Sequence, residues 1–245
     1  MASPVFLCSD LHVGEVLVGG DEGRHAVSVS RMRTGEQVEL VDGAGTRALG
    51  TVIATQRPDR LMVNVTQVAV EPPPQPHLTV VQALPKGDRG ERATEAMTEV
   101  GVDLLVPWAA MRCVTRWKDD RTRAKWIAHA RESTKQARRS RIMEIAPLAS
   151  TDQVVALLRS CPTAVVLHEA PGGQPLAAIE LPASGSMVLV IGPEGGIAPE
   201  ELAAFVGAGA TVARMGPSVL RTSTAGAVAA GVVLSRTARW QDVTP

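Results

Sequence analysis

The chain has 245 residues, enough for one large or two small domains, and its 45% hydrophobic and 20% charged residues are ordinary for a globular protein. No stretch approaches the roughly 18 apolar residues of a membrane span. The three scattered cysteines fit neither a disulfide framework nor a metal site, so we expect a cytoplasmic protein with no metal and no membrane partner. Basic and acidic residues both number 25, so the net charge indicates no partner.

The first 72 residues are predicted to form a small β domain. Alternating or β-branched runs, split by Gly, Asp and Pro, predict strands in "EQVELVDG", "TRALGTVIAT" and "RLMVNVTQVAV". Ahead of them "HAVSVSRMR" is helix-like, and basic residues lie in or beside it: Arg24, His25, Arg31 and Arg33. The segment "VEPPPQPH" has four prolines in five positions, which favours an extended spacer. We therefore expect domains at residues 1–72 and 73–245.

After the spacer, apolar runs alternate with helical patterns. Strands followed by loops are predicted in "LTVVQAL", "VDLLVPW", "AVVLHEA", "MVLVIGPEGG" and "TVARMGPSVLR". Helices are predicted in "RGERATEAMTEVG", which ends in Gly101 as a C-cap, over residues 121–138, and in "TAGAVAAGVVLSRTARW". This alternation indicates an α/β domain, with a mostly parallel sheet covered by helices on both faces.

Two glycine–proline loops follow strands of this sheet. Both "LVIGPEGGIAPEEL" and "MGPSVLRTSTAGAVAAG" lead from a strand into a helix, and open parallel sheets bind ligands at the carboxyl ends of their strands. Neither contains GxxxxGK[ST] or GxGxxG, so a P-loop or dinucleotide site is disfavoured. The first loop alone is equally well explained as a plain turn, with Pro199 beginning a helix after the poor N-cap Ala198. Together with "LHEA", the two loops predict a mainly main-chain slot suited to an adenine and a thioether arm.

Basic residues are concentrated between Arg112 and Arg141. This stretch has eleven basic and three acidic residues, a net charge of +8 inside a neutral chain. Such asymmetry is typical of a surface that binds a polyanion, although each charge alone is more often a solvated surface group.

Four segments, in this order, resemble the RsmE family of 16S ribosomal RNA uridine-N3 methyltransferases, within the SPOUT superfamily: "RHAVSVSRMRTGEQVELVDG", "LPKGDRGERATEAMTEVGVDLLVPW", "VIGPEGGIAPEEL" and "MGPSVLRTSTA". The resemblance implies a PUA-like β-barrel followed by a trefoil-knotted α/β domain that binds S-adenosylmethionine, in a homodimer. It also implies methylation of a uridine in the decoding region of 16S rRNA in the small ribosomal subunit. The alternative is a non-catalytic RNA-binding or ribosome-assembly protein that retains the fold.

The resemblance also indicates the site residues. We expect the cofactor to contact eight residues, mainly through their main chain: Leu167, Ile191, Gly192, Gly196, Met215, Gly216, Leu220 and Arg221. A family arginine maps onto Arg139 of "RESTKQARRSR", where it either stabilises the developing uridinate or contacts phosphate. Lys135 and Ser223 stand where relatives usually have Glu. Arg221 either pins its loop or faces the substrate, and Glu194 is either a base or ties down N–H groups of its own loop.

RNA binding is expected to involve both domains. The guanidinium and ammonium groups of the contact residues would neutralise RNA phosphates, so the affinity for RNA should fall steeply as the salt concentration rises. The expected RNA contacts are Arg24, His25, Arg31, Arg33, Lys86, Arg89, Arg112, Arg116, Arg138 and Arg139.

Overall fold

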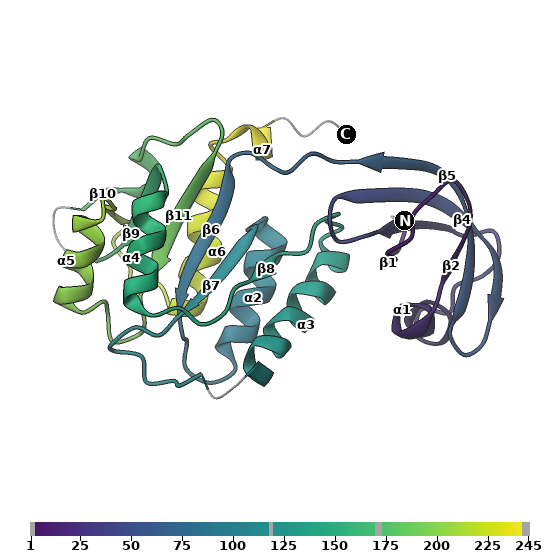
Figure 1. Cartoon of the computed structure of the whole chain (residues 1–245), viewed down its shortest axis with the longest axis horizontal. Coiled ribbons are helices and arrows are strands. Elements are labelled where there is room, and N and C mark those ends of the chain that lie inside the picture. Colours follow the sequence, from purple (N-terminus) through teal and green to yellow (C-terminus); the bar gives the residue numbers. More distant parts are fainter. Residues whose placement is uncertain (1–2, 118–119, 170–172, 242–245) are drawn as a thin grey trace. The chain divides into compact units, whose positions relative to one another are not determined.

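The computed structural model describes residues 3–117, 120–169 and 173–241, in two compact units (Figure 1). The first unit comprises Met1–Pro73 and Thr134–Ile142, and the second comprises Pro74–Ser133 and Met143–Pro245. The domain limits 1–72 and 73–245 stay a prediction. They place residues 134–142 in the second domain, whereas the structure groups Thr134–Ile142 with the first unit. Lys118 and Asp119 of the basic stretch, and Ala170 of "LHEA", lie outside the described residues.

The first unit is built on a five-stranded sheet in the order β1-β3-β4-β5-β2. β1 and β3 are parallel and the other neighbours are antiparallel. The predicted strands "EQVELVDG", "TRALGTVIAT" and "RLMVNVTQVAV" are confirmed as β3, β4 and β5. Their buried side chains, with those of β2, form an aliphatic core around Phe6. The strands are β1 (Val5–Leu7), β2 (Gly14–Val18), β3 (Gln37–Val41), β4 (Thr46–Gln56) and β5 (Arg60–Val70).

A short helical segment packs on this sheet between β2 and β3. It consists of α1 (Gly20–Arg24) and a π-helical turn η1 (His25–Val29), which buries Ala26 and Val27. The helical prediction for "HAVSVSRMR" is therefore correct only up to Val29. Arg31 has a φ of 54°, in the left-handed region, so the chain leaves the helix there. Arg31 and Arg33 consequently lie in the loop that leads to β3.

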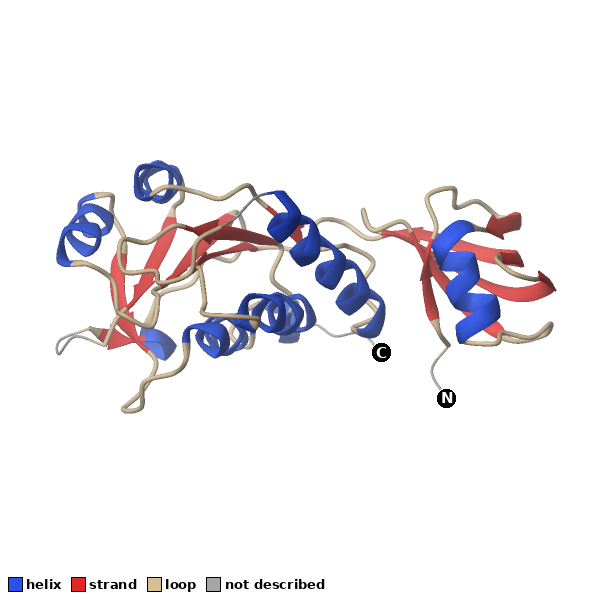
Figure 2. Ribbon diagram, turned by 90° about the horizontal axis from the view of Figure 1, so that it is seen from below, coloured by secondary structure: helices blue, strands red, loops and turns tan. Residues whose placement is uncertain are grey.

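The second unit contains a seven-stranded sheet in which all neighbouring strands are parallel (Figure 2). The strand order is β10-β12-β9-β11-β6-β7-β8, so the chain crosses over the sheet repeatedly. The five apolar runs predicted as strands are confirmed as β6, β7, β9, β11 and β12. The strands are β6 (His77–Ala83), β7 (Leu104–Trp108), β8 (Glu144–Ile145), β9 (Thr163–Leu167), β10 (Gln174–Pro175), β11 (Ser186–Ile191) and β12 (Thr211–Arg214).

Helices cover both faces of this sheet, which confirms the α/β class (Figure 2). Val188 and Val190 of β11 belong to the core that includes Phe205 of α5 and side chains of α4, whereas α6 packs on β6 and β11 and against α2. The predicted C-cap Gly101 ends α2 with a φ of 109°. The helical elements are α2 (Arg89–Val100), α3 (Asp120–Gln136), α4 (Thr151–Ser160), η2 (Leu176–Ala178), α5 (Pro199–Gly207), α6 (Thr222–Leu234) and α7 (Ala238–Gln241).

Within the described residues, no helix is both long and apolar enough to cross a membrane. No group of three His, Cys, Asp or Glu side chains gathers there as a possible metal site. The trefoil knot implied by the family resemblance stays a prediction.

Candidate cofactor pocket at the carboxyl edge of the parallel sheet

Three neighbouring strands of the second unit end side by side. In the sheet register Leu167, the last residue of β9, lies opposite both Ile191 of β11 and Ala213 of β12. Because the strands are parallel, the three loops that follow them begin at one level on one edge. These are "LHEA" and the two glycine–proline loops.

The loops enclose a pocket with a volume of about 690 Å³. This volume falls in the range of about 300–1,000 Å³ that is typical of small-molecule sites. All eight residues predicted to contact a cofactor line it, and Glu194 lines it as well. His168 of "LHEA", which the sequence suggested would border the cofactor through its backbone, lines it too. Sequence reasoning did not select the other lining residues, although most lie in the same loops: Glu169, Pro193, Ile197, Arg214, Pro217, Ser218, Val219, Thr222 and Ala225.

Glycine is required at two points of the first loop, "GPEGG". Gly196 has a φ of 74°, and its N–H group donates to the carbonyl of Pro193 at 2.9 Å, which closes a tight turn. A Cβ atom at Gly192 would lie 2.7 Å from Cγ1 of Ile197, a buried residue that packs beneath the loop. The Arg112 guanidinium donates to the carbonyl of Gly195 at 3.2 Å. The path of the loop therefore depends on its own glycines, and Arg112 adds a contact from a neighbouring segment.

Glu194 connects this loop to the segment between β6 and α2 and to the first residue of α2. Its Oε1 atom accepts the N–H group of Lys86 at 3.1 Å and lies 3.8 Å from Nη1 of Arg89. The carboxylate thus binds a neighbouring loop rather than N–H groups of its own. A role for Glu194 as a base stays a prediction, and these contacts give it a structural role in addition.

The helix after the first loop begins as the sequence predicts. Pro199 is the first residue of α5, and Ala198 is an N-cap without a side-chain hydrogen bond. Glu201, the third residue of α5, supplies the other half of a capping box: it is 2% exposed and accepts the N–H group of Ala198 at 3.2 Å. Glu201 also accepts the N–H group of Met111 and the hydroxyl of Thr151, both at 2.9 Å. Sequence reasoning did not select Glu201 as a site residue.

The second loop ends at the amino terminus of α6. Arg221 is the N-cap and makes no side-chain capping bond, while its carbonyl accepts the N–H groups of Thr224 and Ala225. Thr222 and Ala225 face the pocket, so the first turn of α6 can receive an anionic group. On the sheet side of this turn, the side-chain amide of Gln82 of β6 donates to the carbonyl of Thr222 at 3.3 Å. Gln82 is fully buried, and no motif in the sequence marks it.

The basic residues predicted to bind RNA are divided between the two units. Arg89 and Arg112 contact residues of the first loop and therefore lie at the rim of the pocket, and Lys86 and Arg116 are exposed in the same unit. Arg24, Arg31 and Arg33 are exposed in the first unit, where His25 is half-buried. Arg138 and Arg139 also belong to the first unit, through Thr134–Ile142. Their roles in RNA binding stay predictions.

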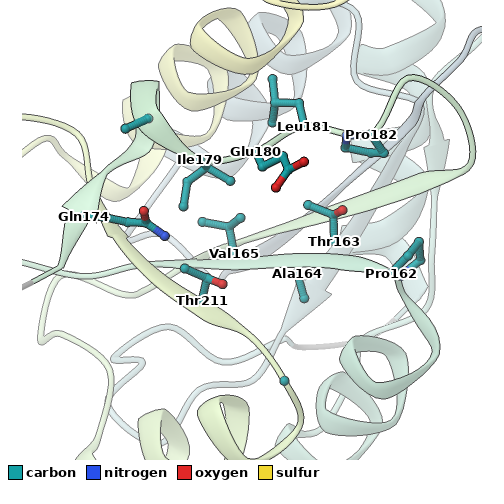
Figure 3. A pocket seen from close by; sticks show the side chains of 12 residues that line it. Pro162, Thr163, Ala164, Val165, Gln174, Ile179, Glu180, Leu181, Pro182 and Thr211 are labelled. Carbon is teal, nitrogen blue, oxygen red and sulfur yellow. The ribbon is translucent and has the colours of Figure 1, made fainter.

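A second cavity, of about 600 Å³, lies at the amino-terminal ends of β9 and β12 (Figure 3). Thr163, Val165 and Thr211 line it from the strands, and Glu180 lies on its opposite wall (Figure 3). None of the residues predicted for the site lines it. Parallel sheets bind ligands at the other edge, so the pocket between the glycine–proline loops is the candidate active site.

The architecture, an antiparallel sheet unit and a parallel α/β unit with a main-chain pocket at its carboxyl edge, is that of an RNA methyltransferase. The model of the RNA methyltransferase domain matches residues 71–234, and that of the RNA methyltransferase PUA domain matches residues 18–59. Ribosomal RNA small subunit methyltransferase E of Mycobacterium bovis is 45% identical over 231 residues, which cover 91% of this chain and 87% of the relative. The protein of that name from Bacillus subtilis is 27% identical, with 85% of each chain covered. The chain belongs to this family of RNA methyltransferases.

Solved structures agree with the fold. A putative methyltransferase from Legionella pneumophila, in complex with S-adenosylmethionine, has a TM-score of 0.85 and 24% identity, with 97% of this chain and 99% of that chain covered. The ribosomal RNA small subunit methyltransferase E from Neisseria gonorrhoeae, bound to S-adenosylmethionine, also has a TM-score of 0.85 and 24% identity, with 96% and 98% covered. The predicted combination of a PUA-type unit with an α/β methyltransferase unit is confirmed.

Proposed function

We propose that this chain methylates N3 of a uridine in 16S ribosomal RNA of the small subunit, with S-adenosylmethionine as the methyl donor. One observation carries the proposal: the two glycine–proline loops and the end of β9 form one pocket, which contains all eight residues selected from the sequence. The curated relatives at 45% identity are ribosomal RNA small subunit methyltransferases, which supports the RNA class of the substrate.

The pocket lining fits S-adenosylmethionine. When bound, this cofactor supplies an electrophilic methyl group on a sulfonium. Ile191, Ile197 and Leu220 offer apolar surface for an adenine. Among the described residues that line the pocket there is no lysine of the kind that binds phosphate chains. The uncapped first turn of α6 suits a carboxylate. A Cβ atom at Gly216 would meet nothing within 4 Å, so the main chain there leaves room for a ligand.

Transfer to N3 requires the uridine to lose a weakly acidic proton, or nearly so, and the negative charge then spreads onto O2 and O4. A guanidinium stabilises such a charge because it stays protonated and presents a planar fork of donors. We assign this role to Arg139, and keep Arg221, which lines the pocket, as a second candidate. The carboxylate of Glu194 already binds Lys86 and Arg89, so a base at that position would first have to release those partners.

The cationic rim of the pocket would guide the RNA. Arg89 and Arg112 each contact the first loop, so their positive charges lie close to the pocket and are suited to attract an RNA backbone toward it. Action on the small subunit places the protein in the cytoplasm. We further propose a homodimer, for which sedimentation equilibrium should give twice the mass of the chain.

The test is methyl transfer to small subunits from a strain that lacks the enzyme, with the product located by mass mapping of the RNA. We expect one N3-methyluridine in 16S rRNA, and calorimetric binding of S-adenosylmethionine but not of ATP. Binding of RNA without methyl transfer would instead identify a ribosome-assembly protein. Absence of S-adenosylmethionine binding at high micromolar concentration would exclude the methyltransferase.

Arg139→Ala tests the role of the guanidinium. We expect kcat to fall about 100-fold because one preorganised donor to the developing charge is lost. The Kd for S-adenosylmethionine should stay within about twofold, since binding of the cofactor rests on main chain. Arg159→Ala, which removes an exposed guanidinium from α4, is the control and should change neither value. Equal losses in kcat and in cofactor affinity would instead assign Arg139 to folding or to cofactor binding.

A further inference from the structure

The segment that carries Arg139 is held by side chains of the first unit. α3 ends at Gln136, and the chain then turns back: the N–H group of Arg138 donates to the carbonyl of Lys135 at 3.1 Å, and that of Arg139 to the carbonyl of Thr134 at 2.9 Å. This is the Schellman pattern, in which a glycine usually occupies the left-handed position. Here that position is Arg138, with a φ of 55°. Arg138 therefore occupies a backbone conformation that favours glycine.

An ion pair of the Arg138 side chain offsets the cost of this backbone conformation. Nη2 of Arg138 lies 2.7 Å from Oε2 of Glu39, whose side chain is 5% exposed. Arg47 also pairs with Glu39, and its Nη2 atom donates to the carbonyl of Arg138 at 3.1 Å. Glu39 thus joins a guanidinium of the segment to one of the sheet. Because the carboxylate is buried, loss of either guanidinium would leave it poorly compensated.

A second ion pair, whose lysine is buried, fixes the residues before the turn. Nζ of Lys135 lies 3.0 Å from Oε1 of Glu22, and the two side chains are 4% and 16% exposed. The other oxygen of Glu22 accepts the N–H group of Leu7 at 3.3 Å. The buried ammonium of Lys135 is therefore matched by a partly buried carboxylate.

The residues after Arg139 are fixed as well. The N–H group of Gly45 donates to the carbonyl of Ser140 at 3.1 Å, and that of Ile142 to the carbonyl of Gly43 at 3.0 Å. The Ser140 hydroxyl donates to Glu71, and the Arg141 guanidinium donates to the carbonyls of Ala44 and Glu71. Both sides of Arg139 are thus attached to the sheet, which restricts where its guanidinium can point.

We propose that Glu22 and Glu39 are positioning residues for methyl transfer: through Lys135 and Arg138 they hold Arg139 in the orientation that the reaction requires. The inference rests on the proposed role of Arg139. It assigns the PUA-type unit a part in turnover in addition to any part in RNA binding.

A charge exchange in the full-length protein tests this inference. Lys135→Glu and Glu22→Lys should each lower kcat about 10- to 100-fold, because a displacement of about 1 Å of a reacting group has an effect of this size. The KM for S-adenosylmethionine should stay within about twofold in both variants. The double variant restores opposite charges and should return kcat to within about threefold of the starting protein. Glu99→Lys, the same charge change at an exposed position of α2, should leave kcat unchanged.

Hydrogen exchange of the peptide that contains residues 134–142 gives the structural readout. Each single variant should lose about tenfold in protection there, and the double variant should regain it. Glu22→Gln and Lys135→Met break the same pair without repulsion, so they test the pair if a reversed charge prevents folding.

Three outcomes would overturn the proposal. The first is a double variant no more active than the weaker single variant, and the second is a single variant with lost protection but unchanged kcat. In the third, Arg139→Ala retains full kcat while the double variant still regains protection; the role of Arg139 then fails, but the attachment of the segment stands. Absence of S-adenosylmethionine binding in the unmodified protein would instead contradict the proposed function itself.

Discussion

The pocket and the segment around Arg139 reach a fixed geometry by different means. The pocket is formed by loops that follow neighbouring strands, and glycines and prolines inside those loops set the main-chain path. The segment Thr134–Ile142 depends on ion pairs and hydrogen bonds between residues far apart in the chain, such as Lys135 with Glu22. A site built from main chain can therefore be recognised from a local motif. A site built from distant charged pairs is recognised only once the fold brings the partners together.

The largest effect is expected where main chain itself makes the wall. Gly216→Val should weaken S-adenosylmethionine binding by at least about 100-fold, because the new side chain enters the space proposed for the ligand. At this position a Cβ atom meets nothing within 4 Å, so the substitution should not disturb the fold. Gly192 is a poorer probe, since a Cβ atom there would displace Ile197. Isothermal titration calorimetry measures the affinity.

Gly207→Val is the matched control. Gly207 is the last residue of α5, it is exposed, and a Cβ atom there also meets nothing within 4 Å. The same change outside the pocket should leave cofactor affinity within about twofold. Unchanged affinity in Gly216→Val would show that the ligand does not occupy this part of the pocket.

Glu201→Gln tests whether the main-chain walls depend on one buried side chain. Glu201 accepts three hydrogen bonds, from Met111, Thr151 and Ala198, and an amide would turn a donor toward one of these donors. We expect a loss of about 2–3 kcal/mol in the free energy of unfolding, the usual size for a buried hydrogen bond to a charged group. For a chain of this length that corresponds to a fall in Tm of about 5–10 °C, measured by calorimetry.

Glu200→Gln is the control for this substitution. Glu200 lies in the same first turn of α5 but is exposed, so its replacement should change Tm by less than about 2 °C. If both variants have the same Tm as the starting protein, then the path of the first loop is set by its own glycines and proline. The contrast between the pocket and the segment would then be complete.

Local patterns predicted much of the fold. Eight strands, the C-cap at Gly101 and the beginning of α5 at Pro199 all follow from residues close together in the chain: the strands are β3, β4, β5, β6, β7, β9, β11 and β12. The two-residue strands β8 and β10 were not predicted. The eight pocket residues were predicted from the resemblance to the RsmE family, and they lie at or after the ends of β9, β11 and β12.

The remaining features depend on contacts that no local pattern encodes. The order of the strands, the burial of Glu201 under the pocket and the bond from Gln82 to the start of α6 all arise from crossovers between segments distant in the chain. The ion pair of Arg138 with Glu39 joins residues 99 positions apart. Residues 134–142 looked like the end of a basic helix in the second domain, and only the fold shows their attachment to the first unit.

The smallest effect expected is a loosening of Thr134–Ile142 in acid. Burial opposes ionisation of Glu71, yet hydrogen bonds from Ser140 and Arg47, together with the charges of Arg47 and Arg141, hold its pKa below the usual value. The pKa of Asp42 is also lowered, because hydrogen bonds in the turn containing Thr46 and Ala44 outweigh burial.

A carboxyl with a lowered pKa stabilises the folded state fully above its unfolded pKa of about 4, and this stabilisation disappears as the pH falls through the folded pKa. Amide exchange in the peptide containing residues 134–142, corrected for intrinsic rates, should therefore rise by about two- to fivefold between pH 5 and pH 3. The effect is small because Glu71 is 44% exposed at its side chain and solvent screens its charge. Glu71→Gln should remove most of this pH dependence, and Asp42→Asn the remainder. A rise of equal size in the variant that combines Glu71→Gln with Asp42→Asn would contradict this assignment of the acid sensitivity to Glu71 and Asp42.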